Sequence, residues 1–168
     1  MNISSFDGLP DETRIWIYAA ERKLTPSETT LLEKRMSSFI VDWTAHKREL
    51  RASWAFVYNQ FVIVAVDESL MTASGCSIDS MTRNLVAFEA QIGCKLVGTG
   101  MQIFYRTEEG GVKNLPRLAF KSQVEQKKVT GDTIVFDNTI QTLGALKVGQ
   151  WETIFQNSWH SEAFSAQL

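Results

Sequence analysis

A polar segment with one cysteine carries the clearest chemical signal in the sequence. Cys76 lies in Ser74-Gly75-Cys76-Ser77, directly before a run with helical spacing. At the start of a helix, backbone N–H groups and the helix dipole lower the pKa of a thiol, which is how many nucleophilic cysteines are activated. Gly75 allows the backbone conformations that such loops often need. The alternative is structural: Cys76 is a small residue beside a helix cap whose oxygen comes from Ser77 or Asp79.

A thiol enzyme also needs a base and a group that orients it. Either histidine, His46 or His160, could act as the base to Cys76, with Asp67 or Glu68 as the orienting carboxylate. His46 also fits a position after a helix, where an imidazolium interacts favourably with the C-terminal dipole, and His160 fits a half-buried structural position among aromatic residues. The Asp67-Glu68 pair could itself serve in acid–base chemistry. Consecutive residues of a strand point to opposite faces, however, and the alternative is a pair of solvated carboxylates at a strand end.

The backbone amides of the same segment could instead bind a phosphate or a carboxylate. Neither the P-loop pattern G-x-x-x-x-G-K-[ST] nor the dinucleotide-binding pattern G-x-G-x-x-G occurs in the chain. Because no complete catalytic motif is present, the sequence favours a module that binds a small molecule or a protein through the loop between Asp67 and Asp79. The predicted ligand-binding residues are Ser69, Ser74, Gly75, Ser77 and Asp79. The alternative is a thiol-dependent hydrolase, transferase or redox enzyme with Cys76 as nucleophile.

Composition and charge limit the classes of function. The chain has 168 residues, 44% of them hydrophobic and 21% charged, which is typical of one globular domain with its own core. The formal net charge is −2 and no cluster of Lys and Arg is present, so we expect no nucleic-acid partner. The longest apolar run, Phe61–Val66, is too short to cross a membrane. The first residues show neither a basic nor an apolar segment, so we expect no secretory signal and a cytoplasmic location.

The cysteines and histidines give no sign of a metal site. Cys76 and Cys94 stand at opposite ends of a predicted helix, too far apart to form a disulfide with each other. No C-x-x-C occurs, and the two histidines do not have the spacing of neighbouring ligands on a helix. We therefore expect neither a bound metal nor a cofactor.

Alternating strands and helices must position these residues. Arg14–Ala19 and Phe61–Val66 are predicted strands, and the uniformly apolar Phe61–Val66 is expected at the centre of the sheet. Thr25-Pro26-Ser27-Glu28 predicts a helix start with a capping box. The helix that follows is expected to end near Ala45 or His46. Its apolar stripe consists of Leu32, Met36, Phe39 and Trp43.

Hairpins and a second helix complete the pattern. Leu50–Tyr58 predicts a strand that turns at Asn59-Gln60 into the central strand. Ile78–Ile92 predicts a helix with Gly93 as its C-cap. In the second half of the chain, the predicted elements are strands at Met101–Arg106, Val112–Phe120 and Asp132–Phe136 and a short helix within Lys121–Lys128. Pro116 assigns its strand to an edge.

These elements predict an α+β protein with a mainly antiparallel sheet and helices packed on it. We expect a single domain over residues 1–168, in which residues 1–13 form a loose N-terminal arm. The five tryptophans are expected to fill the core rather than to line a pocket.

Several segments together resemble a known protein family: Arg14–Tyr18, Trp43–His46, Val66–Ser69, Ser74–Ser80 and Ser158–His160. The combination resembles an uncharacterised conserved family of bacterial proteins from the Bacteroidetes, and Ser74–Ser80 is its most specific part. Members sometimes carry the label "ABC transporter ATPase", but this chain lacks the Walker A loop that such chemistry requires. The resemblance implies no activity. It implies that one pattern contains His46, Asp67, Glu68, Ser69, Cys76, Ser77, Asp79 and His160.

Overall fold

The computed structural model describes residues 3–45 and 48–164. The chain forms two compact units, one made of Met1–Thr99 with Gln141–Gly144 and the other of Gly100–Ile140 with Ala145–Leu168. Each unit contains an antiparallel sheet and helices, so the predicted α+β class is confirmed. The expectation of one domain over the whole chain stays a prediction.

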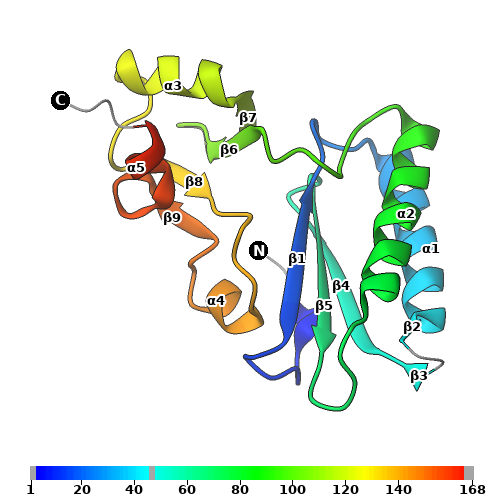
Figure 1. The fold of residues 1–168 in the computed structure, drawn as a ribbon. Coiled ribbons are helices and arrows are strands. Elements are labelled where there is room, and N and C mark those ends of the chain that lie inside the picture. The colour runs from blue at the N-terminus through cyan, green and yellow to red at the C-terminus, as the bar shows by residue number, and fades with distance from the viewer. Residues whose placement is uncertain (1–2, 46–47, 165–168) are drawn as a thin grey trace. The chain divides into compact units, whose positions relative to one another are not determined.

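The first unit is built on a three-stranded sheet in the order β1-β5-β4 (Figure 1). The strands are β1 (Arg14–Ala19), β4 (Arg51–Val57) and β5 (Phe61–Asp67), and both pairings are antiparallel. Every residue of β5 is buried, which confirms the central position predicted from its apolar run. The hairpin between β4 and β5 turns through Tyr58, Asn59 and Gln60. Tyr58 and Asn59 adopt positive φ angles of 56° and 54°, which tight hairpin turns require.

The helix α1 (Pro26–Asp42) begins at the predicted capping box. Thr25 Oγ1 accepts a hydrogen bond from the Glu28 amide at 3.3 Å, and Glu28 Oε2 accepts one from the Thr25 amide at 2.8 Å. Arg22 donates to both oxygens of Glu28 at 2.8 Å. These hydrogen bonds, from Arg22 first and from Thr25, lower the pKa of Glu28 to about 2. Arg22 also donates to the Ile92 carbonyl, so it joins the start of α1 to the end of the second helix.

The end of α1 comes earlier than predicted. The backbone of Trp43 is extended, with φ −75° and ψ 117°, and its carbonyl accepts a hydrogen bond from the Leu50 amide at 3.1 Å. Two short strands, β2 (Thr44–Ala45) and β3 (Arg48–Glu49), then pair with each other. Because this ladder requires extended backbone, the helix cannot continue to Ala45.

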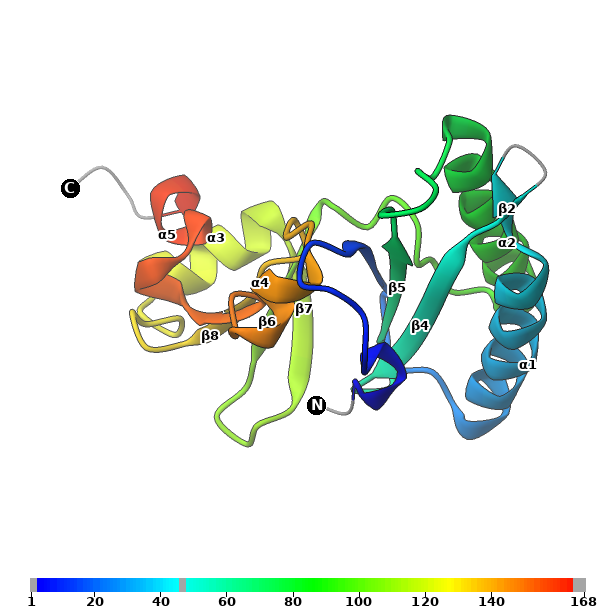
Figure 2. The same ribbon diagram turned by 90° about the horizontal axis from the view of Figure 1, so that it is seen from below.

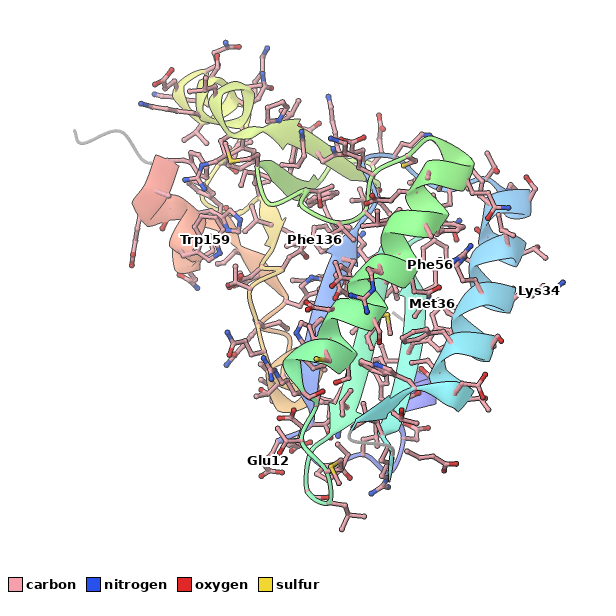
Figure 3. The ribbon with its side chains drawn as sticks, turned by 45° about the vertical axis from the view of Figure 1, so that its right-hand side comes forward. Glu12, Lys34, Met36, Phe56, Phe136 and Trp159 are labelled. Atoms are coloured by element: carbon pink, nitrogen blue, oxygen red, sulfur yellow. The ribbon has the colours of Figure 1, made fainter. Side chains whose placement is uncertain are left out.

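The helix α2 (Gly75–Ile92) lies beside α1 on one face of the sheet, as Figures 1 and 2 show. It begins three residues before the predicted start and ends at Gly93, whose φ of 63° confirms the predicted C-cap. The two helices and the sheet share a core whose buried members include Leu32, Met36, Val62, Val64, Val66, Met81, Leu85 and Phe88. In Figure 3, Met36 points from α1 toward this core and Lys34 points away from it.

Residues 3–13 are packed rather than loose. A 3₁₀-helix, η1 (Ser4–Phe6), places the ring of Phe6 in the interior at 1% exposure. Ser53 Oγ of β4 donates to the Ser5 carbonyl at 2.7 Å, and Arg51 donates to the Gly8 carbonyl at 3.2 Å. The expectation of a loose arm is therefore wrong for this part, because a buried aromatic ring and two side-chain hydrogen bonds attach it to β4.

The second unit contains a four-stranded antiparallel sheet in the order β7-β6-β8-β9. Its strands are β6 (Gln102–Arg106), β7 (Val112–Pro116), β8 (Ile134–Phe136) and β9 (Glu152–Ile154). Pro116 ends the edge strand β7, as predicted, but the strand does not reach Phe120. Instead α3 (Arg117–Glu125) follows Pro116, a position where the missing N–H of proline costs nothing. The remaining elements of this unit are η2 (Phe155–Asn157) and α5 (Trp159–Phe164), while α4 (Leu143–Lys147) begins in the first unit and ends in the second.

An aromatic core holds the second unit together. Its buried members are Ile103, Tyr105, Phe120, Val129, Val135, Phe155 and Phe164. Among the described residues of the whole chain, no helix has the length and apolar character needed to span a membrane.

Candidate functional site

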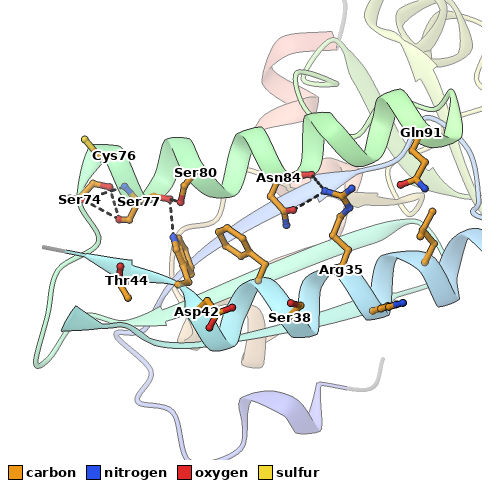
Figure 4. Close-up of a pocket in the computed structure, with 14 residues that line it drawn as sticks. Arg35, Ser38, Asp42, Thr44, Ser74, Cys76, Ser77, Ser80, Asn84 and Gln91 are labelled. Atoms are coloured by element: carbon orange, nitrogen blue, oxygen red, sulfur yellow. Dashed lines mark hydrogen bonds between the residues drawn. The ribbon is translucent and has the colours of Figure 1, made fainter. Parts of the chain in front are cut away.

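A groove of about 880 Å³ lies between α1 and α2. The helices are antiparallel, because the residue after α1 bonds to the first turn of α2 while Arg22 bonds to its last residue. Figure 4 shows the groove with the side chains that line it. They come from α1 (Leu31, Lys34, Arg35, Ser38, Phe39, Asp42), from α2 (Cys76, Ser77, Ser80, Asn84, Gln91) and from the flanking residues Trp43, Thr44 and Ser74.

Two aromatic rings form an apolar part of the groove. The ring centroids of Phe39 and Trp43 are 5.4 Å apart. Trp43 is 3% exposed, and its Nε1 donates to the Ser77 carbonyl at 2.9 Å, which fixes the end of α1 against the first turn of α2. Phe39 was predicted to be a core residue with Leu32 and Met36. The structure leaves it half-buried: it packs against the core and also lines the groove.

Arg35 supplies the main charge inside the groove. Its Nη1 donates to the carbonyl oxygen of Asn84 at 3.3 Å and to Asn84 Oδ1 at 3.0 Å. Asn84 in turn contacts Met36 Sδ through Nδ2 at 3.8 Å. Within residues 3–45 and 48–164, no carboxylate forms an ion pair with Arg35. The half-buried guanidinium of Arg35 therefore faces the groove. Asn84 holds it in place, and no described carboxylate neutralises its charge.

The first turn of α2 closes one end of the groove. Ser74 is its N-cap: Ser74 Oγ accepts from the Ser77 amide at 3.2 Å, and Ser77 Oγ donates to the Ser74 carbonyl at 2.7 Å. The cap oxygen thus comes from Ser74 and not from Ser77 or Asp79, and Asp79 is exposed on another side of the helix. The amides of Gly75 and Cys76 are the first two of the helix and have no acceptor within it.

Cys76 is an exposed free thiol at the rim of the groove. In Figure 4 its side chain points away from the other labelled residues, so the sulfur lies outside the space between the helices. The first unit contains no histidine among its described residues, and His46 lies outside them. A Cys–His pair in this unit therefore stays a prediction that depends on His46.

The carboxylates of Asp67 and Glu68 shape the loop between β5 and α2. Asp67 is 3% exposed; its Oδ1 accepts from the Ser69 amide at 3.0 Å and its Oδ2 from Arg51 Nη1 at 2.7 Å. The hydrogen bonds from Ser69, followed by the charge of Arg51, lower the pKa of Asp67. Glu68 Oε1 accepts from the Ala73 amide at 2.9 Å. Both groups bind the backbone of their own loop, and neither lines the groove.

His160 belongs to the core of the second unit. It is 1% exposed, and its ring stacks on Trp159 at 3.8 Å between centroids and lies 6.5 Å from those of Phe120 and Phe164. Its Nδ1 has no hydrogen-bond partner. Burial lowers the pKa of His160 to about 4, so the imidazole is neutral at pH 7. The sequence predicted a half-buried position, and the surrounding aromatic rings bury it completely.

The groove thus contains only part of the predicted site. Nine of the ten residues predicted for catalysis or binding are among the described residues, and of these nine the groove is lined by Ser74, Cys76 and Ser77. Sequence reasoning missed the polar and aromatic positions that face across it: Arg35, Ser38, Phe39, Ser80 and Asn84. A signal was present, because these residues recur at helical spacing beside the buried stripes of the two helices.

Among the described residues, no group of three or more His, Cys, Asp or Glu side chains is arranged to hold a metal ion. No protein-family model, curated protein sequence or solved structure matches the chain. The resemblance to the Bacteroidetes family therefore stays a prediction.

Proposed function

We propose that this protein is a binding module whose site is the groove between α1 and α2. The observation that carries the proposal is the uncompensated guanidinium of Arg35 beside the half-buried ring of Phe39 in an open groove of about 880 Å³. Small-molecule sites typically have volumes of roughly 300–1,000 Å³ and combine apolar surface with a few polar groups. The groove has this size and this composition.

The second unit contains another cleft, of about 700 Å³, but it fits a ligand less well. It is lined by the turn between β6 and β7 and by residues of the segment 128–134, and charged side chains of both signs dominate it. Arg106, which lines it, already pairs with Glu152 at 2.6 Å. A nucleic-acid partner is also a poor fit, since the net charge is −2.

The proposal is tested by nuclear magnetic resonance with phenol as a simple ring probe. Titration of the ¹⁵N-labelled protein should shift the amide signals of residues that line the groove, above all those around Phe39 and Ser80. Shifts confined to other surfaces would refute the proposal.

A matched pair of variants tests the same site. Ser37 and Ser38 are neighbouring exposed residues of α1, but only Ser38 lines the groove. Ser38→Trp should fill the groove and abolish the phenol-induced shifts, while Ser37→Trp should leave them unchanged. An equal response of the two variants would place the phenol elsewhere.

A thiol-dependent enzyme is the second candidate, and the exposed free thiol of Cys76 favours it. The rate of Cys76 alkylation measured against pH, in a Cys94→Ser background, tests this alternative. An apparent pKa well below about 8.5 would indicate an activated thiolate. A rate that follows an ordinary thiol pKa would leave the binding module as the function.

A further inference from the structure

The chemistry of the groove points to one class of ligand. We propose that it selects a small monocarboxylate with an apolar body, whose carboxylate pairs with Arg35 and whose body lies on Phe39. This inference rests on the proposed function, because it specifies what the same groove binds.

The donors of Arg35 favour a carboxylate. A guanidinium has five N–H donors in a planar fork. In the described structure, Asn84 accepts only from Nη1, so the Nε and Nη2 donors remain for a ligand. Two parallel hydrogen bonds from such a fork match the two oxygens of a carboxylate. The contact with Asn84 also holds the guanidinium in one orientation, which lowers the entropic cost of binding.

The neighbours of Arg35 on α1 favour an apolar body next to that carboxylate. Leu31 and Phe39 lie one turn before and one turn after Arg35, and side chains four residues apart on a helix are neighbours. Both are half-buried and line the groove. A ligand paired with Arg35 therefore meets an apolar side chain on either side, and one or two rings are enough to cover Phe39.

The charges around Arg35 disfavour a second anionic group. Asp42 lies two turns farther along α1, beyond Phe39, and lines the groove without an ion pair in the described structure. A carboxylate at the far end of the ligand would be repelled by Asp42. Among the described residues that line the groove, the other cation is Lys34, which points away from the core in Figure 3, so it adds little for a doubly charged phosphate.

The test compares three fluorescent naphthalene probes: 2-naphthoate, its neutral analogue 2-naphthamide, and naphthalene-2,6-dicarboxylate. We expect the wild-type protein to bind 2-naphthoate about 10-fold or more tightly than 2-naphthamide, because only the carboxylate carries a negative charge and two acceptor oxygens for the guanidinium fork. The dicarboxylate should bind more weakly than 2-naphthoate, and Asp42→Asn should reduce that difference.

Variants of Arg35 complete the test. Arg35→Gln should remove the preference for 2-naphthoate over 2-naphthamide, and Arg35→Lys, which keeps the charge but lacks the fork, should reduce it. Arg83→Gln is the matched control, since Arg83 is exposed on α2 and does not line the groove. Circular dichroism establishes that each variant is folded, and Arg35→Lys carries the test if Arg35→Gln is not.

The outcomes separate this inference from the proposed function. Equal affinity for 2-naphthoate and 2-naphthamide within the groove, or a preference that is undiminished in the folded Arg35 variant, would overturn the monocarboxylate inference and leave the groove as a binding site. Binding of both probes only outside the groove would contradict the inference and the proposed function together.

Discussion

Protonation of the buried His160 should make the protein less stable in mild acid. The folded state holds the imidazole among aromatic rings, and its pKa falls from 6.5 to about 4. The unfolded chain has the ordinary pKa, so between these values the unfolded state binds more protons than the folded state. As far as this histidine is concerned, the free energy of unfolding therefore has its full value above pH 6.5 and decreases as the pH falls toward 4.

The magnitude follows from the shift itself. One pKa unit corresponds to about 1.36 kcal/mol, so the decrease from 6.5 to about 4 corresponds to about 3 kcal/mol of unfolding free energy. The charged groups that act on the ring are Asp137, which favours the protonated form, and Arg117, which opposes it. Neither balances the desolvation of a side chain that is 1% exposed.

Urea unfolding followed by tryptophan fluorescence at pH 7, 6, 5 and 4 measures this effect. His160→Phe keeps a ring in the core and removes the titration, so the wild-type protein should lose about 3 kcal/mol more than this variant between pH 7 and 4. Comparing the two pH dependences cancels the contribution of carboxylates such as Glu28 and Asp67, which both proteins share. Identical pH dependences for the two proteins would refute the assignment of His160 as a buried neutral residue.

Three further predictions concern the frame that holds the groove. Trp43→Phe removes the hydrogen bond to the Ser77 carbonyl and should cost about 2 kcal/mol of stability in chemical denaturation, whereas an unchanged midpoint would show that this bond does not stabilise the first turn of α2. Thr25→Ala removes the N-cap of α1 and should cost about 1 kcal/mol, measured by thermal unfolding, while Thr25→Ser should cost less; equal losses would contradict the capping role. Glu89 Oε1 accepts from the backbone amides of Leu96 and Val97, so Glu89→Ala should cost about 2 kcal/mol of stability and speed amide hydrogen exchange at these two positions. Glu89→Gln keeps an acceptor oxygen and is the control; if the two variants protect these amides equally from exchange, the role of the Glu89 oxygen is contradicted.

Local sequence patterns predicted the frame of the first unit well. The uniformly apolar Phe61–Val66 required burial on both faces, and the structure places it as the central strand. Thr25, Pro26 and Glu28 specify a helix start through contacts within a few residues, so the capping box could be recognised without the fold. Gly93 at the end of α2 is a similar case, because the positive φ of a C-cap favours glycine locally.

The groove could not be predicted in the same way. Whether Phe39 faces the sheet or the neighbouring helix depends on how α1 and α2 pack, and a helical stripe alone does not determine that packing. Asp67 and Glu68 have the residue types of a catalytic pair, but the register of β4 against β5 places Arg51 beside Asp67, and the course of the loop places Ala73 beside Glu68. The second half of the chain was harder still: Pro116 is compatible both with an edge strand and with a helix start, and the structure uses it for both.

The most direct test of the binding site is the nuclear Overhauser effect between bound 2-naphthoate and the protein. We predict contacts from the naphthalene protons to the ring of Phe39 and to the side chain of Leu31, the apolar residues on either side of Arg35. Contacts instead to Tyr105 or Ile134, which line the cleft of the second unit, would contradict the assignment of the groove between α1 and α2 as the functional site.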